Sequence, residues 1–303
     1  MIYIIFVVSL AVLLVGSDWL IESAEKIGLS FGISPFIIGV TIVAFGTSLP
    51  ELATSLASVA SETSEIVIGN VVGSNIANIL LVLGLTTIVG KGIKLDFNIM
   101  EVDMPLLIIS AILFYFAVYD LQFTFIEAII FILALVFFLY STVTGNIDEG
   151  NERPKVSIKK YILLVVGGVM VYLGATYTIY SLEKIAIELG LAPSLIALTV
   201  IAIGTSLPEV IVSMAAARKG KHAIAVGNVL GSNIFNTYGV MAIPSLYGGI
   251  DIPSNMLDFS VPFMIVITLL FAFIVLTNKI GQWVGVMLVL LYIFYITHVI
   301  HIS

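Results

Sequence analysis

Two acidic residues lie in identical six-residue motifs within long apolar stretches. The motif Gly-Thr-Ser-Leu-Pro-Glu occupies residues 46–51 and again residues 204–209, and it ends at Glu51 and Glu209. Each proline lacks an N–H and its ring crowds the carbonyl four residues earlier, so a helix must open there. The opening frees carbonyl oxygens beside two hydroxyls and a carboxylate. These hard oxygen ligands suit Ca²⁺ and Na⁺ and suit soft metals poorly.

The alternative is that the proline only kinks a membrane helix and that the carboxylate pairs with a neighbouring base. No Lys or Arg is expected at the depth of Glu51 or Glu209. Because an uncompensated carboxylate inside a membrane is costly, a cation is the expected partner of both glutamates.

A second repeated motif, Gly-Asn-x-x-Gly-Ser-Asn-x-x-Asn, follows each first motif, at residues 69–78 and 227–236. Its polar residues spaced by four lie along one stripe of a helix; they are Asn70, Ser74 and Asn78, and Asn228, Ser232 and Asn236. We expect its glycines to allow close helix contact: Gly69 and Gly73, and Gly227 and Gly231. Hydrogen bonding between helices is an alternative role, above all for Asn70 and Asn228.

The elements that position these motifs are membrane spans. The 303 residues are 60% hydrophobic and 10% charged, with a mean hydropathy of +1.19, which disfavours a soluble enzyme. There is no cysteine, and the three histidines lie in a short connection or near the C-terminus, so thiolate and imidazole metal sites have no ligands in the core. Hydropathy predicts ten spans, near 2–21, 34–60, 66–89, 101–119, 123–142, 161–181, 192–217, 222–247, 258–277 and 281–301.

The basic residues predict which side of the membrane each connection faces. All Lys and Arg residues except Lys184 fall in connections that lie on one side when ten spans are drawn, at 22–33, 90–100, 143–160, 218–221 and 278–280. The positive-inside rule makes that side cytoplasmic. The sequence therefore predicts a multi-pass protein of the plasma membrane with both termini outside.

An internal repeat divides the chain into halves. A shift of 158 residues aligns 27–78 with 185–236 without a gap. We interpret 1–144 as one five-helix repeat, 145–160 as a cytoplasmic linker and 161–303 as the second repeat. Because five is odd, the second repeat enters the membrane from the opposite side. Inverted repeats of this kind are typical of alternating access around a site near the midplane.

The two motifs, present twice in this order, resemble the alpha-1 and alpha-2 repeats of the sodium/calcium exchanger family, most closely its compact prokaryotic type. The resemblance covers nearly the whole chain. It implies an all-α integral membrane fold of ten transmembrane helices, with helices 2 and 7 discontinuous, and an electrogenic exchange of three Na⁺ for one Ca²⁺. Both ions are transported, so the resemblance implies no enzyme and no cofactor.

The resemblance also implies a set of site residues. It places Ca²⁺ on Glu51 and Glu209 with the backbone carbonyls of Thr47 and Thr205. The Na⁺ sites would add Ala44, Ser48 and Ser74 from one repeat, and Ala202, Ser206 and Ser232 from the other. Asn78 and Asn236 would flank the centre. Potassium-dependent relatives carry aspartate at the position of Asn236, so a potassium requirement is not expected.

Sodium/calcium antiport is accordingly the predicted function. The expected partners are Ca²⁺, Na⁺ and the lipid bilayer, with no nucleic acid and with the oligomeric state left open. Proton/calcium exchange is the second transporter hypothesis, because Glu51 and Glu209 could carry protons. A passive cation channel and an intramembrane carboxylate hydrolase are alternatives from other classes. The hydrolase is disfavoured because the motifs supply no nucleophile and base pair.

Overall fold

The computed structural model of the chain describes residues 1–95, 99, 103–144, 155–189 and 204–302, and these residues are predominantly helical. Within that part, six helices are long and apolar enough to cross a membrane. A seventh span results if the pair Pro35–Thr47 and Leu49–Ala60, bent by 41°, is counted as one. The chain is therefore an all-helical, multi-pass membrane protein. Of the predicted span 192–217, only the part from residue 204 lies within the described residues.

The helices and strands follow one another in a repeated order. The first half contains α1 (Ile2–Ser30), α2 (Pro35–Ile38), η1 (Gly39–Val43), α3 (Ala44–Thr47), α4 (Leu49–Ala60), α5 (Glu65–Ala77), η2 (Asn78–Val82), α6 (Leu83–Val89), β1 (Ile93–Lys94), α7 (Asp103–Ala117), β2 (Gln122–Phe123) and α8 (Phe125–Thr144). The second half contains α9 (Ile158–Glu188), α12 (Leu207–Arg218), α13 (His222–Phe235), η4 (Asn236–Val240), α14 (Ala242–Ser245), β3 (Ile250–Asp251), η5 (Met256–Ser260), α15 (Val261–Val275), β4 (Lys279–Ile280) and α16 (Gln282–Ile302).

Several boundaries recur at the offset found in the sequence. Adding 158 to the bounds of α4, η2 and α7 gives the bounds of α12, η4 and α15. The two π-helical segments η2 and η4 therefore stand at equivalent positions, and each begins at the last asparagine of the second motif.

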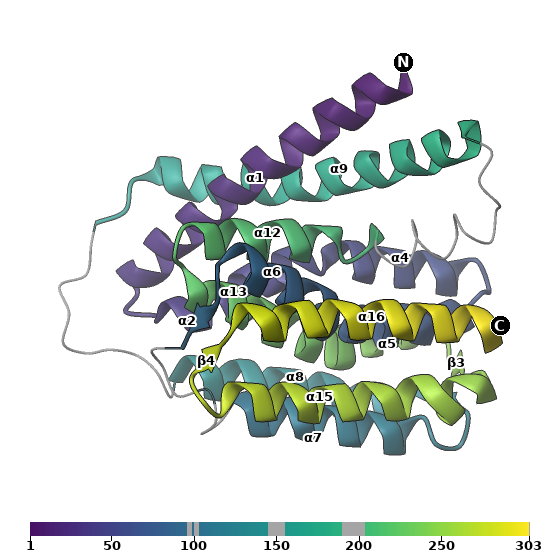
Figure 1. Cartoon of the computed structure of the whole chain (residues 1–303). Helices are drawn as coiled ribbons and strands as arrows, with labels where there is room; N and C mark the ends of the chain where they lie inside the picture. The colour runs from purple at the N-terminus through teal and green to yellow at the C-terminus, as the bar shows by residue number, and fades with distance from the viewer. Residues whose placement is uncertain (96–98, 100–102, 145–154, 190–203, 303) are drawn as a thin grey trace.

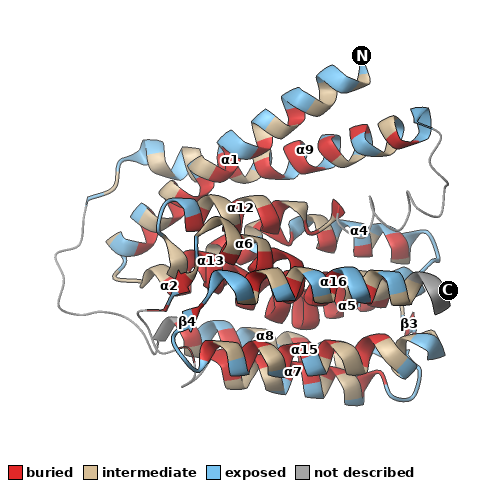
Figure 2. Cartoon of the chain, in the orientation of Figure 1, coloured by how far each residue is buried: buried red, intermediate tan, exposed pale blue. Residues whose placement is uncertain are grey.

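The helices α1 and α9 form a separate layer across the other helices (Figure 1). Their backbones approach closely: a Cβ added at Gly174 would lie 2.7 Å from the backbone nitrogen of Leu13. Most of the outward side of this layer is exposed (Figure 2), as expected of apolar side chains that face lipid. The layer leaves α5 and α13 in the interior.

The helix α1 is longer than its predicted span. The prediction ended the span near residue 21 and placed a connection at 22–33, whereas α1 continues to Ser30. The charged residues Glu22, Glu25 and Lys26 were interpreted as a loop, but Glu22 and Glu25 instead lie on a helix and form ion pairs with lysines of other elements. Charge alone does not end a helix at a membrane surface.

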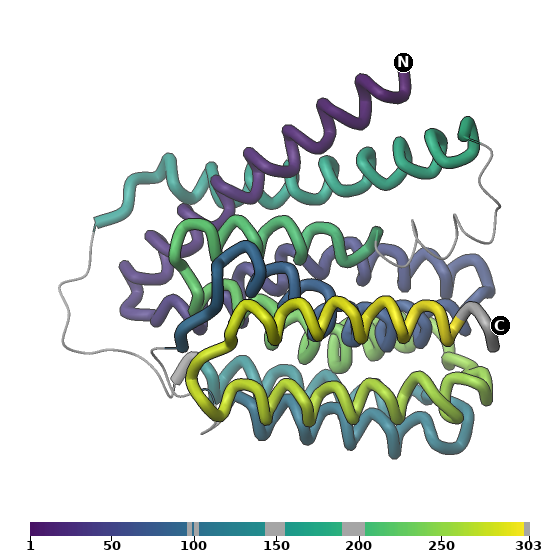
Figure 3. The backbone as a smooth tube through the Cα atoms, viewed as in Figure 1, coloured from purple at the N-terminus to yellow at the C-terminus, as the bar shows by residue number. Residues whose placement is uncertain are grey.

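The centre of the molecule consists of the helices that carry the second motif. The smooth backbone trace shows α5 and α13 passing between the α1–α9 layer and the layer of α7, α8 and α15 (Figure 3). Every residue of α13 from Ile224 to Phe235 is buried. Because the helices around it are apolar, the polar side chains of α13 have only other polar side chains or bound ions as partners.

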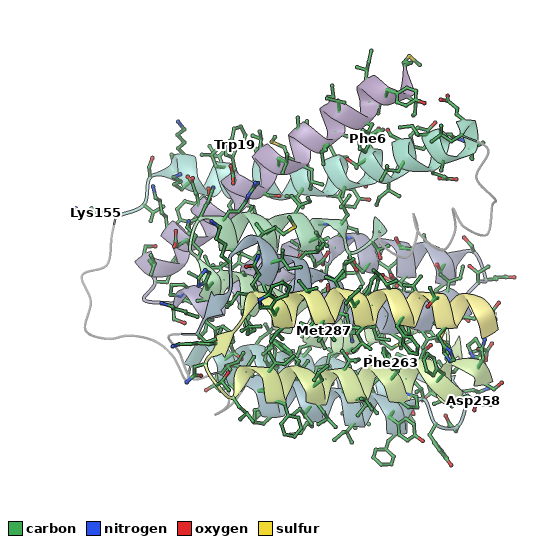
Figure 4. All side chains as sticks on the ribbon, viewed as in Figure 1. Phe6, Trp19, Lys155, Asp258, Phe263 and Met287 are labelled. Carbon is green, nitrogen blue, oxygen red and sulfur yellow. The ribbon has the colours of Figure 1, made fainter. Side chains whose placement is uncertain are left out.

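Two short strand pairs join connections at opposite ends of the molecule. The strand β1 pairs with β4, and β2 pairs with β3, each antiparallel and two residues long. Lys155, which precedes α9, lies at the left end in Figure 4, and Asp258 lies at the right end, where α1 begins and α16 ends. The turn with β4 lies at the left end with Lys155 (Figure 1). The connections therefore gather into two groups, as the predicted sidedness requires.

Candidate cation-binding site

Both first motifs open the helix at the serine. Ser48 has φ −89° and ψ 7°, and Ser206 has φ −83° and ψ 4°, outside the helical region, and each proline stands in the first turn of the helix that follows. The backbone bonds across the first break are Ser48 N–H to the Ala44 carbonyl at 3.0 Å and Leu52 N–H to the Ser48 carbonyl at 3.2 Å. The predicted opening of the helix is confirmed in the first copy. In the second copy α12 begins in the same way after Ser206, and the residues before Gly204 lie outside the described part.

The carboxylates stand in the first turn of the helices α4 and α12. Glu51 and Glu209 are 1% and 0% exposed. The N-terminal end of a helix carries a partial positive charge, which favours a carboxylate there. That partial charge does not neutralise a buried carboxylate, and no described Lys or Arg side chain is buried. Both glutamates therefore lack a basic partner.

The two repeats meet at these glutamates. The hydroxyl of Ser48 donates a hydrogen bond of 3.1 Å to Oε1 of Glu209. Among the described atoms, both carboxylate oxygens of Glu51, Oε2 of Glu209 and Oγ of Ser206 have no hydrogen-bond partner. This concentration of buried oxygen atoms without donors is a suitable environment for a cation.

The threonines of the two motifs reach the second motif of the opposite repeat. The hydroxyl of Thr47 donates to Oδ1 of Asn228 at 3.1 Å and lies 3.5 Å from Oγ of Ser232. The hydroxyl of Thr205 lies 3.4 Å from Oγ of Ser74. Each broken helix is therefore joined to the polar stripe of the other half.

Asn70 and Asn228 hold the broken helices in place. The amide nitrogen of Asn70 donates to the carbonyl of Glu51 and to Oγ of Ser55, both at 2.9 Å. The amide nitrogen of Asn228 donates to Oγ of Ser213 at 2.9 Å. These bonds match the alternative role considered for the two residues, which is to join helices.

A second pair of asparagines joins the halves at the start of the π-helical segments. The amide of Asn78 donates to Oδ1 of Asn233 at 3.0 Å, and the amide of Asn75 donates to Oγ1 of Thr237 at 2.9 Å. Asn236 is fully buried, and neither its Nδ2 nor its Oδ1 has a partner among the described atoms. Single π-helical turns are frequent at functional sites.

Sequence reasoning missed Asn75 and Asn233 as site candidates. Both lie in the repeated Gly-Ser-Asn segment, but they fall outside the stripe with a spacing of four and were therefore not selected. Two features of the sequence could have selected these asparagines: they recur in both copies of the motif, and both copies lie well inside a predicted membrane span.

Of the two alanines in the predicted site, Ala44 and Ala202, only Ala44 belongs to the described residues. The Ala44 carbonyl accepts from the Ser48 N–H at 3.0 Å and lies 3.2 Å from the Thr47 hydroxyl. That hydroxyl has a single proton, so when it donates to Oδ1 of Asn228 the second lone pair of the Ala44 carbonyl is available for a cation. Ala202 lies outside the described residues.

The glycines of the second motif differ between the copies. A Cβ at Gly231 would lie 2.1 Å from the carbonyl oxygen of Val40, and one at Gly227 would lie 2.4 Å from that of Phe36. The predicted close contact is therefore confirmed for this copy. Among the described atoms, a Cβ at Gly73 would meet nothing within 4 Å. A Cβ at Gly69 would lie 3.5 Å from Cε of Met256, an ordinary contact. Residues 194 and 198, which correspond to Phe36 and Val40 in this copy, lie outside the described residues, so the predicted contact is not tested there.

Two cavities lead toward the site. One, of about 370 Å³, extends from exposed Glu65 past Asn70 to Ser74 and Thr205. The other, of about 390 Å³, lies between α9 and α4 and also ends at Thr205. Thr205, whose hydroxyl contacts that of Ser74, therefore lines both cavities.

The arrangement excludes several kinds of site. Among the described residues no group of three or more His, Cys, Asp or Glu could hold a metal ion. The site instead combines two carboxylates with hydroxyl, amide and carbonyl oxygens. Oxygen ligands of low total charge are suited to reversible binding of Ca²⁺ or Na⁺.

Comparison with known proteins gives a consistent result. The model of the family described as "Sodium/calcium exchanger protein" matches residues 1–144 and 159–301. The sodium/calcium exchanger MaX1 of Methanosarcina acetivorans is 33% identical, over 99% of this chain and 99% of its own. An uncharacterized membrane protein of Methanocaldococcus jannaschii is 34% identical over 95% and 94%. The solved structure of the sodium-calcium exchanger NCX_Mj soaked with Na⁺ and Ca²⁺ matches with a TM-score of 0.85 and 33% identity, over 97% of this chain and 96% of that one.

Proposed function

The chain belongs to the sodium/calcium exchanger family, and from this premise we propose that it exchanges Na⁺ for Ca²⁺ across the membrane by alternating access. Glu51 and Glu209 are the central ligands. The observation that carries the proposal is the pair of buried carboxylates, one from each first motif. Of their four oxygens, only Oε1 of Glu209 accepts a hydrogen bond, from Ser48, and neither carboxylate has a basic partner among the described residues. The protein is a transporter and not an enzyme.

The proposed stoichiometry of three Na⁺ for one Ca²⁺ is the one that the family resemblance implies, and the charges of the site are compatible with it. Two carboxylates balance one Ca²⁺ or two Na⁺, and the neutral residues Asn78 and Asn236 add no charge. A third Na⁺ leaves one excess positive charge in the loaded site. Exchange of three Na⁺ for one Ca²⁺ is then electrogenic, and moving one charge through 100 mV is worth about 2.3 kcal/mol. A negative-inside potential therefore favours Ca²⁺ extrusion.

We assign the twelve predicted residues to this exchange. The carbonyls of Thr47 and Thr205 complete the Ca²⁺ site with the two glutamates. The Na⁺ sites use Ala44, Ser48, Ser74, Ala202, Ser206 and Ser232, while Asn78 and Asn236 flank the centre. The contacts Ser48–Glu209, Thr47–Ser232 and Thr205–Ser74 support this grouping, because each joins members of opposite halves.

The proposed architecture is ten spans in two inverted repeats, residues 1–144 and 161–303, joined by the linker 145–160. The strand pairs support it. A shift of about 158 residues brings β1 onto β3 and β2 onto β4. The relation between the two repeats therefore turns the pair β1–β4 at one end of the molecule into the pair β2–β3 at the other end. Such an exchange is what an inverted two-fold relation produces.

We place both termini outside the plasma membrane, because the basic residues gather in the connections on the other side. The absence of a carboxylate at Asn236 supports exchange without K⁺.

The deciding experiment measures radioactive Ca²⁺ uptake into Na⁺-loaded proteoliposomes. Uptake is expected to require the outward Na⁺ gradient, to increase with an inside-positive potential and to be unaffected by K⁺. Uptake that is equal without Na⁺ but driven by a pH gradient would establish the proton/calcium alternative and overturn the proposal. Conductance without counter-transport would identify a channel.

A further inference from the structure

Two lysines face each other at the end of the molecule that carries the basic connections. In the pair of β1 with β4, Lys94 stands directly opposite Lys279, and both side chains are exposed. Their neighbours Ile93 and Ile280 are each 1% exposed, so the ladder buries the isoleucines and directs both lysines away from the core. Like charges directly opposite each other destabilise such a pair.

Three other lysines at this end form ion pairs with acidic side chains of α1. Lys219 pairs with Asp18 at 2.6 Å and with Glu22 at 3.5 Å, Lys221 pairs with Glu25 at 2.6 Å, and Lys160 lies 3.7 Å from Glu22. No ion pair among the described residues includes Lys94 or Lys279. Among the residues that the structure describes, no acidic side chain offsets the repulsion between the facing lysines.

An apolar groove begins beside these lysines. It lies between α15 and α16, the two helices joined by the turn that contains β4, and its volume is about 620 Å³. All its lining side chains are apolar, among them Ile274, Trp283, Met287 and Phe294. From Trp283 to Phe294 the groove follows about 16 Å of helix. Met287 lies on the near side of α16 in Figure 4.

Trp283 marks the level of the membrane surface. It is 82% exposed, four residues after Lys279 and one residue into α16. Tryptophan is enriched at the boundary between headgroups and acyl chains. The lysines are thus at headgroup level and the groove is at acyl-chain level.

We propose that one anionic phospholipid binds here, with its phosphate between Lys94 and Lys279 and an acyl chain in the groove of α15 and α16. The phosphate relieves the repulsion between the lysines, and the chain covers apolar surface that no other described element covers. Because the two strands belong to opposite halves of the chain, the lipid joins the halves at this end. The site is separate from the carboxylate site and does not depend on which ions are exchanged.

The test is native mass spectrometry of the full chain in detergent with equimolar phosphatidylglycerol and phosphatidylcholine. The wild type is expected to retain one phosphatidylglycerol. The double variant Lys94→Gln/Lys279→Gln is expected to bind it roughly tenfold to thirtyfold more weakly, since each lysine near a phosphate contributes to lipid affinity. The matched control Lys155→Gln/Lys159→Gln removes two exposed lysines from the same end and should retain the lipid.

Further arms separate the two parts of the site. Met287→Trp fills the groove at a side chain that is 64% exposed, so it should weaken lipid retention without disturbing the core. Inorganic phosphate should not displace the lipid at equal concentration. Equal retention of phosphatidylcholine, full competition by phosphate, or unchanged retention in the Lys94 and Lys279 variant would each overturn the proposal.

Discussion

Glu209 and Glu51 occupy equivalent positions in two identical motifs, yet their partners differ. Glu209 accepts a hydrogen bond from Ser48, whereas among the described residues the equivalent Ser206 does not bond to Glu51. The helix breaks are nearly the same, with φ and ψ at the two serines within a few degrees. Identical sequence thus gives identical local backbone, but the side-chain partners depend on how the two halves dock.

The docking difference extends beyond the carboxylates. The segment α2–η1–α3 packs tightly on α13 through Gly227 and Gly231. The two cavities are lined in part by the other copy, at Gly73, Ser74 and Thr205. In this copy the segment that corresponds to α2 and η1, residues 193–201, lies outside the described residues.

The largest expected effect comes from neutralising either carboxylate. Glu51→Gln and Glu209→Gln should each reduce Na⁺-dependent Ca²⁺ uptake below detection, because one remaining carboxylate cannot balance Ca²⁺. Glutamine keeps the shape and still accepts the Ser48 bond, so both variants should assemble. Uptake into proteoliposomes measures the effect, with exposed Glu188→Gln as the control. Retained uptake by one variant would show that the halves differ in ion binding as well as in contacts.

The second effect concerns packing. Gly231→Ala would place a methyl group 2.1 Å from the Val40 carbonyl oxygen, while Gly73→Ala meets no described atom within 4 Å. Forced overpacking against backbone costs about 3 kcal/mol. We expect a large fall in the thermal unfolding temperature in detergent for Gly231→Ala and little change for Gly73→Ala. Equal losses would show that both copies are tightly packed in solution.

The third effect isolates the hydrogen bond to Glu209. Ser48→Ala leaves Oε1 of Glu209 without its donor, which should cost about 1.5 kcal/mol in cation-free buffer. Ser206→Ala removes a hydroxyl with no described partner and should cost less. The difference in unfolding temperature should shrink in saturating Ca²⁺, since the cation then pairs with Glu209. A Ser206→Ala loss as large as that of Ser48→Ala would contradict the asymmetry.

The sequence was sufficient to predict the helix break in the first motif because the determinants of the break are local. Pro50 and Pro208 lack an N–H and break the helix whatever surrounds them, and the position of each break followed directly. The π-helical segments at Asn78 and Asn236 were not predicted, because no residue type specifies them. The contact of Ser48 with Glu209, and not of Ser206 with Glu51, could not follow from two identical motifs.

The length of α1 was also not predictable from local signals. Its acidic residues Glu22 and Glu25 resemble a loop in hydropathy, but they stay helical beside lysines that are distant in sequence. Hydropathy reports the depth of a residue in the membrane and not the end of its helix. Span boundaries are therefore the part of the prediction that tertiary contacts decide.

The smallest effect tests the two lysines that only one half carries in the turn between its broken helix and the next helix. Lys219 and Lys221 tie the turn between α12 and α13 to α1, while the equivalent positions in the other half are Ser61 and Thr63. Ion pairs of partly exposed groups are worth about 1 kcal/mol or less. Lys219→Gln/Lys221→Gln should therefore make opening between α1 and α12 only severalfold more frequent.

A single cysteine can report this opening, because the chain has none. Ser23 is fully buried on α1, between the acidic residues Glu22 and Glu25, and its hydroxyl has no described partner. Maleimide labelling of Ser23→Cys should become roughly threefold to fivefold faster when both lysines are replaced, the change expected from losing about 1 kcal/mol. Lys155→Gln/Lys159→Gln provides the control with equal charge removal. An unchanged rate would mean that packing alone keeps this end closed, because the buried apolar contacts of α1 with α12 would then suffice without the ion pairs.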